Sequence, residues 1–272
     1  MSVIQRFELR VPDGFDVTRP NVARICDYLL FGKDNFAPDR AVAEELESAG
    51  LEPRQLALAN RAFLRRAVQT AAANGVSQFL DLGCGFPTWP SVDEIAREVL
   101  SGARVVYVDH DPVVVAHNDA LLGTGDGVGA IRADLCDPES VMEAVTLSGC
   151  IDFGLPVAVL LTAVLHFISD DENPEAIIGR LRRRLAPGSY LVLGACTSDG
   201  ADPVLTAAAE SAYKATLTPF TARTRQQITQ YFDGFEMLPP GVVCPTGWRP
   251  CACTDRTPLK TPYLCGMGQL RK

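Results

Sequence analysis

Short apolar runs alternate with longer stretches of helical period between residues 76 and 196. The runs are Phe79–Leu82, Arg104–Val108, Ala130–Leu135, Val157–Leu165 and Ser189–Ala195. Apolar runs of this length, separated by helix-length segments, predict parallel strands that are covered on both faces and joined by crossover helices. We therefore expect an α/β fold with a mostly parallel sheet in this part of the chain.

The segment before these strands predicts three helices. Residues 1–18 are expected to be extended, and Val22, Ile25, Cys26 and Leu29 then repeat at helical spacing, with Gly32 as a candidate C′ residue. Pro38 predicts the start of a second helix that runs to about 49, and a third is expected over 53–73. We expect residues 1–75 to form a helical extension, or lid.

The segment after the fifth run predicts two helices and two further strands. The helices are expected over 203–214 and 224–231, and the strands over 234–238 and 263–270, with a proline-rich loop at 239–262 between them. Together with the five strands predicted above, these two strands predict a seven-stranded, mostly parallel sheet with one antiparallel strand. Residues 76–272 are expected to form one compact domain.

Four helix starts carry a local signal. Ser91 with Glu94 and Thr224 with Gln227 have capping-box spacing. Asp111 and Asp137 each precede a proline, as an N-cap residue followed by proline at N1 would.

A glycine turn and an acid indicate a cofactor site. Gly83 and Gly85 follow the first strand, where a backbone without Cβ can turn sharply and approach a ligand. Asp109 ends the second strand, where a carboxylate can accept hydrogen bonds from both hydroxyls of a ribose. The pair predicts a nucleoside-bearing cofactor across the first two strands.

The loop after the glycines discriminates between cofactors. A dinucleotide fold would place a third glycine at position 88, but this chain has Thr88 in a bulky loop, and the next helix begins only near Ser91. Such a loop suits a cofactor without a pyrophosphate. S-adenosylmethionine (SAM) fits this description, and a nicotinamide-dependent oxidoreductase is the weaker alternative.

Further cofactor residues are expected near the strand ends. Asp81 can hold the turn or a water near the SAM amino group, and Asp134 can accept from the adenine amino group. Arg61 and Lys33 are candidates for the SAM carboxylate. The remaining members of the predicted cofactor set are His110, Leu135, Thr162 and Tyr28.

The candidate acceptor side rests on one histidine and four aromatic residues. His166 follows the fourth strand and is either a general base or a packing residue of the pocket. The aromatic candidates for the pocket wall, each with core packing as the alternative role, are Tyr28, Phe31, Phe36 and Trp89.

Residues 76–196 carry, in order, the glycine turn, the acid for the ribose, the acid for the adenine and Pro187-Gly188 before the fifth strand. In this order of motifs they resemble class I SAM-dependent methyltransferases. A narrower resemblance covers nearly the whole chain. The segments Arg19–Ile25, Asp27–Leu30, Gly32–Phe36 and Asn60–Arg66 are similar to the signature of a bacterial family of S-adenosyl methyltransferases formerly called a domain of unknown function. The resemblance implies the fold and the cofactor but no defined acceptor, and it does not extend to Cys251, Cys253 and Cys265.

Composition limits the classes of substrate, compartment and metal that are expected. The formal net charge of −8, without a dense basic tract outside Arg180–Arg184, disfavours a nucleic-acid substrate. No apolar run reaches membrane-spanning length, and the first residues lack a signal-peptide core, so a cytoplasmic protein is expected. Nine cysteines predict reduced, mostly buried thiols. Cys244, Cys251, Cys253 and Cys265 have poor spacing for zinc, and no metal is expected.

We therefore predict a SAM-dependent methyltransferase that acts on a small-molecule acceptor by O- or N-methylation. The alternative is a SAM-binding protein without transferase activity, either a sensor or a degenerate enzyme. The sequence leaves the acceptor and the oligomeric state open.

Overall fold

The structure is a computed structural model that describes residues 16–123, 125–216, 218–252, 257 and 259–271. Most of the segment expected to be extended, residues 1–15, therefore lies outside the described residues, and residues 17–18 form a turn. Within the described ranges, every helix is too short or too polar to cross a bilayer.

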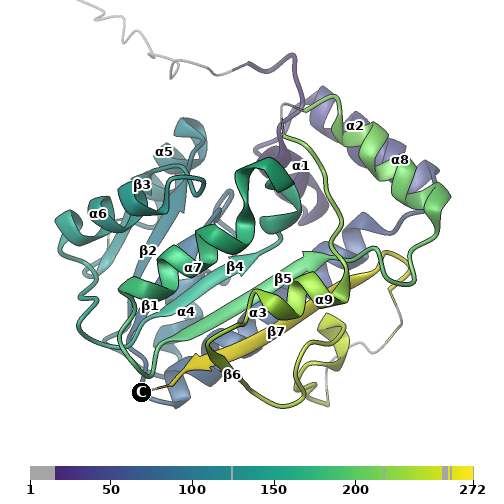
Figure 1. Cartoon of the computed structure of the whole chain (residues 1–272). Helices are drawn as coiled ribbons and strands as arrows, with labels where there is room; N and C mark the ends of the chain where they lie inside the picture. The colour runs from purple at the N-terminus through teal and green to yellow at the C-terminus, as the bar shows by residue number, and fades with distance from the viewer. Residues whose placement is uncertain (1–15, 124, 217, 253–256, 258, 272) are drawn as a thin grey trace, which may run out of the picture.

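The predicted sheet is confirmed. Seven strands form one sheet in the order β3-β2-β1-β4-β5-β7-β6, and β7 is antiparallel to both of its neighbours, β5 and β6 (Figure 1). The strands are β1 Gln78–Leu82, β2 Arg104–Asp109, β3 Val128–Arg132, β4 Ala158–Thr162, β5 Tyr190–Cys196, β6 Phe235–Met237 and β7 Tyr263–Leu270.

Two strands end earlier than the apolar pattern predicts. β4 ends at Thr162, because Ala163 adopts a positive φ of 58° and the chain then forms the short 3₁₀ helix η1 at Leu165–Phe167. β3 ends at Arg132, so that Asp134 lies in the following turn. Periodicity alone does not mark these ends, since the apolar run continues beyond the last ladder hydrogen bond.

The helices lie close to their predicted positions, and all four start signals are confirmed. Ser91 and Thr224 form capping boxes, and the side chains of Asp111 and Asp137 accept from backbone N–H groups of the first turn. The helices are α1 Val22–Leu29, α2 Ala37–Ser48, α3 Pro53–Ala73, α4 Val92–Arg97, α5 Pro112–Leu121, α6 Pro138–Ser148, α7 Pro174–Arg184, α8 Pro203–Tyr213 and α9 Arg225–Gln230, with two further 3₁₀ turns, η2 Asp170–Glu172 and η3 Pro245–Gly247.

Gly32 does not end the first helix as a C′ residue. Leu30 is the C-cap, and Phe31 takes the left-handed conformation with φ 64°. Gly32 is instead required by close packing, because a Cβ at this position would lie 1.8 Å from Oδ1 of Asp27. The glycine is therefore needed for its contact with Asp27, five positions earlier, and not as a C′ residue.

Alternating side chains build a core on each face of the sheet. Phe79 and Val105 point to the face covered by α3 and α4, where Phe63 packs edge-on against Trp248 with ring centroids 5.3 Å apart. Leu80 and Val106 point to the face covered by α6, α7 and α9. The strand pattern thus gives a three-layer arrangement.

The N-terminal helices divide into two roles. α3 belongs to the sheet core, since its Phe63, Ala67 and Ala71 are fully buried in it. α1 and α2 form a separate small core with α8, in which Ile25 and Leu46 are buried, and α2 lies beside α8 (Figure 1). α1 and α2 are therefore the part of the extension that lies over the sheet edge.

Candidate functional site

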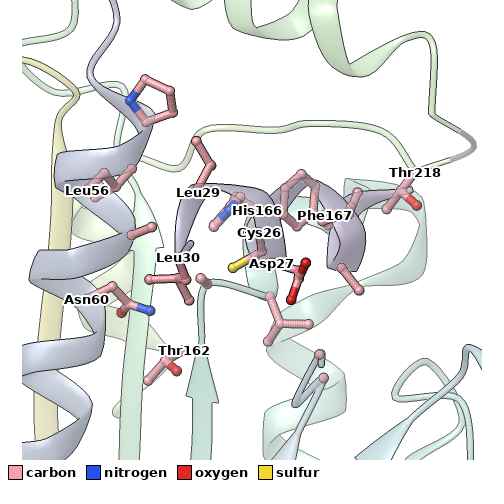
Figure 2. Close-up of a pocket in the computed structure, with 18 of the residues that line it drawn as sticks. Cys26, Asp27, Leu29, Leu30, Leu56, Asn60, Thr162, His166, Phe167 and Thr218 are labelled. Atoms are coloured by element: carbon pink, nitrogen blue, oxygen red, sulfur yellow. The ribbon is translucent and has the colours of Figure 1, made fainter. Parts of the chain in front are cut away.

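A cavity lies at the carboxyl ends of β1, β2 and β4. Its floor is built by residues that follow these strands, and α1, α3 and α8 contribute the other walls. Figure 2 shows side chains of α1 and α3 facing the end of β4 across this space. The predicted site residues that line it are Arg61, Asp81, Gly83, Gly85, Asp109, His110, Thr162 and His166.

The glycine turn needs both of its glycines. Gly83 has φ 68° and Gly85 has φ 64°, a conformation that side chains rarely adopt. A Cβ on Gly83 would lie 2.5 Å from Cγ2 of Val164, whereas a Cβ on Gly85 would meet no atom within 4 Å. Gly83 therefore permits close packing within the protein, and Gly85 leaves open space beside the cavity.

Asp109 is fixed at the end of β2 by backbone donors. Its Oδ2 accepts from the N–H of Gly85 and its Oδ1 from the N–H of Asp111, each at 3.0 Å. The side chain is buried, and burial raises its pKa, while the two backbone hydrogen bonds oppose this shift. His110 is exposed, with Nδ1 3.5 Å from Asp109 Oδ1. The carboxylate and the glycine turn are thus one hydrogen-bonded unit.

Asp81 and Arg61 form the charged part of the cavity. Burial raises the pKa of Asp81 to about 7, with Arg61 opposing the shift and Asp109 adding to it. Arg61 donates to the carbonyl oxygen of Thr88 at 2.8 Å and to that of Pro90, and burial lowers its pKa. Its Nε is buried and has no hydrogen-bond partner among the described residues. Arg61 therefore braces the loop after the glycines and keeps one unused donor.

Three residues of the predicted cofactor set do not line the cavity. Asp134 is exposed, and its Oδ1 accepts from the N–H of Cys136 at 2.9 Å, as a turn aspartate does. Leu135 is buried in the core on the α6 and α7 face. Tyr28 packs against the guanidinium of Arg54, 5.1 Å from its ring centroid. Their assignment to the cofactor stays a prediction.

The other candidates from the N-terminal turn and the glycine loop are also outside the cavity lining. The side chain of Lys33 is 87% exposed and pairs with Asp34. Phe31 and Trp89 are exposed, and Phe36 lies beside the guanidinium of Arg24. The sequence marks these residues as aromatic or basic, but the direction of each side chain depends on tertiary packing.

His166 is buried among aromatic side chains. Its Nδ1 accepts from the N–H of Cys196 at 3.5 Å, and its ring lies 5.6 Å from that of Phe220. Burial, together with the positive charge of Arg223, lowers the pKa of His166 to about 3. The imidazole is therefore neutral at neutral pH, and the arrangement favours the pocket role over the base role.

The lining residues that were not predicted from the sequence include Asp27, Asn60 and Tyr263. The hydroxyl of Tyr263 donates to Oδ1 of Asn60 at 2.9 Å and accepts from the N–H of Ala163 at 3.0 Å. These two hydrogen bonds fix the Asn60 amide beside Ala163, the positive-φ residue that follows β4. Asp27 and Asn60 each begin a segment similar to the family signature, Asp27–Leu30 and Asn60–Arg66, but Asn60 and Tyr263 lie 203 positions apart and no local signal predicts their contact.

The cysteines differ from the expectation. Seven are free thiols, of which Cys196 and Cys265 are buried and the other five are partly exposed, and Cys251 is disulfide-bonded. Cys253 lies outside the described residues. In the described part of the chain, no three His, Cys, Asp or Glu side chains gather closely enough to hold a metal ion.

The residues present fit SAM. Gly85 leaves open space beside a buried carboxylate, Asp109, that can accept from ribose hydroxyls, and Arg61 Nε is an unused donor for a carboxylate. Helix α4 begins only at Val92, beyond the loop that Arg61 braces. The arrangement offers donors and acceptors for a nucleoside and an amino-acid tail.

Comparison with known proteins identifies relatives over the full chain. A crystal structure of a protein from Thermobifida fusca YX, named a methyltransferase, is 37% identical with a TM-score of 0.88 and covers 97% of this chain and 100% of its own. A DUF574 family protein from Streptomyces avermitilis MA-4680 is 32% identical with a TM-score of 0.88, over 94% of this chain and 99% of its own.

A solved structure of much lower sequence identity is similar to this chain in its fold alone. The plantazolicin methyltransferase BamL, solved with S-adenosylhomocysteine (SAH), is 12% identical with a TM-score of 0.55, over 92% of this chain and 96% of its own. A search of curated proteins finds no significant match. The sequence profile of the family described as S-adenosyl methyltransferase matches residues 9–271. The chain belongs to this family of SAM-dependent methyltransferases, with SAM as its cofactor.

Proposed function

We propose that this enzyme transfers the methyl group of SAM to a small-molecule acceptor that binds in the part of the cavity distant from Gly85. The observation that carries this proposal is the division of the lining. Glycine and charged residues from the ends of β1 and β2, with Arg61 of α3, form part of the lining, whereas α1, α3, α8 and the loop at 218–220 contribute mostly apolar or aromatic residues together with the acid Asp27. An apolar compartment next to a cofactor edge is the usual setting for a small organic ligand.

Aromatic rings support a flat or cationic acceptor. Tyr213 and Phe220 are stacked, with centroids 5.4 Å apart and an interplanar angle of 11°. Phe167 packs edge-on against Tyr213 at 5.0 Å. All three rings line the cavity. The formal net charge of −8 argues against a polyanionic acceptor such as a nucleic acid.

Bound SAM supplies an electrophilic methyl group on a sulfonium. The chain's own residues then have three tasks: Asp109 and the glycine turn hold the ribose side, Arg61 and Asp81 face the amino-acid tail, and α1 and α3 exclude water. His166 is a poor general base because its conjugate acid is too acidic to form near neutral pH. The acceptor atom must therefore be nucleophilic without proton removal by His166.

We propose that the N-terminal helices and the rest of the chain have different roles in the reaction. Within residues 1–75, α1 and α2 provide the lid, and residues 76–272 together with Arg61 of α3 bind the cofactor. α1 supports the lid role, since its residues Cys26, Asp27 and Leu29 line the cavity (Figure 2). Closure over the methyl group would protect the reaction from water.

The test is a two-stage binding and turnover experiment. Calorimetry with SAM and SAH measures cofactor binding, and SAH release is then followed with panels of small amines, phenols and carboxylates, with duplex DNA as a macromolecular comparison. The proposal expects SAH release with a small-molecule panel and not with DNA. Cofactor binding with no turnover across all panels would favour a SAM-binding protein without transferase activity.

A further inference from the structure

Asp27 is a buried acid in the acceptor part of the cavity. It lies on the buried side of α1 and lines the cavity near Cys26 and Leu30, as Figure 2 shows. Its Oδ2 accepts from the N–H of Asp34 and from the side-chain amide of Asn35, each at 2.8 Å. Both donors are neutral, so these hydrogen bonds orient the carboxylate without neutralising its charge.

The second oxygen of Asp27 has no such partner. Oδ1 accepts no hydrogen bond from any residue in the described ranges, and it lies against Gly32, whose missing Cβ leaves it room. The carboxylate is thus held by one oxygen, through the turn at 32–35, while the other oxygen stays available.

No Arg or Lys of the described chain lies within ion-pair distance of Asp27, and the charge of Lys33 only partly opposes the effect of burial on its pKa. Arg61 is the single Arg or Lys among the described lining residues, and it donates to the carbonyl oxygens of Thr88 and Pro90. The Lys33 ammonium lies 3.0 Å from Asp34 on an exposed side chain. A buried carboxylate without a cation is costly, and burial accordingly raises the pKa of Asp27. A ligand that brings a positive nitrogen or an N–H donor removes this cost.

The same cavity offers a second feature that favours a cation. Phe167, Tyr213 and Phe220 line it with their rings in contact with one another. Aromatic faces attract ammonium groups, and an anion or a neutral hydroxyl gains nothing comparable from them. A carboxylate and aromatic rings in one apolar cavity are a combination suited to an amine on an aromatic or apolar body.

We infer that Asp27 binds the amino group of the methyl acceptor, so that the substrates are small primary or secondary amines. This inference rests on the proposed function. The bound ammonium first loses one proton to solvent, which frees the nitrogen lone pair. That lone pair then forms the new N–C bond while the methyl–sulfur bond breaks and its electron pair stays on sulfur. The positive charge passes to nitrogen, where Asp27 stabilises it, and the proton is then lost to solvent.

The experiment uses the full chain saturated with SAH and three probes that share one ring: benzylamine, benzyl alcohol and benzoate. Calorimetry or ligand-observed NMR gives the affinity of each probe. The expected result is that benzylamine binds roughly tenfold more tightly than benzyl alcohol, with benzoate weaker still. Asp27→Asn, which keeps an oxygen acceptor for the turn at 32–35, should remove most of this preference and leave SAH affinity unchanged.

Asp34→Asn is the matched control. It removes one negative charge from the same turn, but Asp34 does not line the cavity, so the amine preference should persist. Equal affinity of the wild-type protein for benzylamine and benzyl alcohol would overturn the inference, as would an Asp27→Asn protein that binds SAH and retains the preference. If SAH itself does not bind the wild-type protein, the proposed function fails as well, which separates the two results.

Discussion

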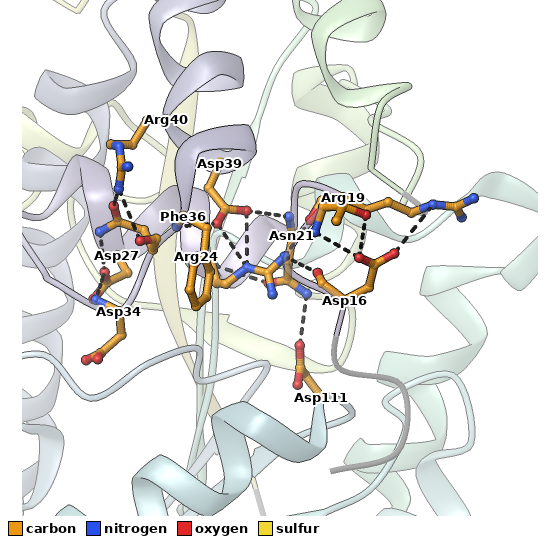
Figure 3. Close-up of polar contacts among 12 residues, drawn as sticks. Asp16, Arg19, Asn21, Arg24, Asp27, Asp34, Phe36, Asp39, Arg40 and Asp111 are labelled. Atoms are coloured by element: carbon orange, nitrogen blue, oxygen red, sulfur yellow. Dashed lines mark hydrogen bonds and ion pairs between the residues drawn. The ribbon is translucent and has the colours of Figure 1, made fainter. Parts of the chain in front are cut away.

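The side-chain amide of Asn21 donates a hydrogen bond to Oδ2 of Asp111 at 2.9 Å (Figure 3). Asn21 is the N-cap of α1 and Asp111 is the N-cap of α5. This contact joins the start of the first N-terminal helix to the segment that directly follows Asp109. The proposed lid is therefore attached at the carboxyl edge of the sheet, and Arg24 with Asp39 reinforces this segment through a buried ion pair of 3.0 Å.

The first prediction concerns this attachment. Asn21→Asp keeps an acceptor for the N-cap of α1 but places a carboxylate beside Asp111. Repulsion on the scale of about 1 kcal/mol should loosen the lid. Hydrogen exchange of the SAH-bound protein should show protection of residues 21–36 in the wild type and less in the variant. Asn21→Ser, which preserves capping without the charge, should have the smaller effect. Equal protection in all three proteins would mean that the lid does not depend on this contact.

The second prediction tests the ribose assignment. Asp109→Ala should weaken SAM binding by roughly 1.5–3 kcal/mol, the scale for losing hydrogen bonds to a charged group. Calorimetry measures the effect, and circular dichroism checks the fold. Asp119→Ala, at an exposed position of α5, is the control and should bind SAM normally. Unchanged affinity in a folded Asp109→Ala protein would remove the assignment.

The third prediction separates the two glycines of the turn. Gly83→Ala and Gly85→Ala each carry the left-handed penalty of about 1–2 kcal/mol. Gly83→Ala adds a clash with Val164 and should lower the melting temperature further. Gly85→Ala, which faces open space, should instead show its larger effect on SAM affinity. Thermal unfolding and calorimetry of the pair test this, and equal losses of stability would contradict it.

The fourth prediction follows from Asp81. Its pKa is about 7 in the folded protein and 3.8 in the reference state, so the folded protein binds the extra proton between these values. This contribution to stability is full below pH 3.8 and falls as pH rises toward 7, by up to about 1.4 kcal/mol per pH unit. Urea unfolding between pH 5 and pH 8 should show Asp81→Asn gaining stability relative to the wild type up to about pH 7 and no further.

The fifth prediction concerns His166, whose shift has the opposite sign. Its pKa is about 3 in the folded protein, against 6.5 in the reference state. The unfolded chain therefore takes up the proton first, and stability is lost as pH falls below about 6.5. NMR of the imidazole should show a neutral ring throughout pH 5–8. A ring that protonates within this range would restore the general-base role.

Local sequence determined much of this protein. Helix starts at Ser91, Asp111 and Thr224 depend on partners two or three residues away, and such signals can be read directly. The alternation of Phe79 and Leu80 between the two faces follows from the period of a strand. The position of Asp109 at the end of β2 follows from the end of the apolar run Arg104–Val108. The carboxyl ends of parallel strands lie on one edge of a sheet, which is why the cofactor edge could be predicted.

Tertiary structure alone decided the acceptor side. Tyr263 reaches Asn60 from the opposite end of the chain. Tyr28 and Trp89, which the sequence offered as pocket walls, point elsewhere. A helix pattern defines which face is buried but not which neighbour covers it. Side chains from α1, α3 and β7 form one cavity because distant elements pack together, and no local pattern encodes that contact.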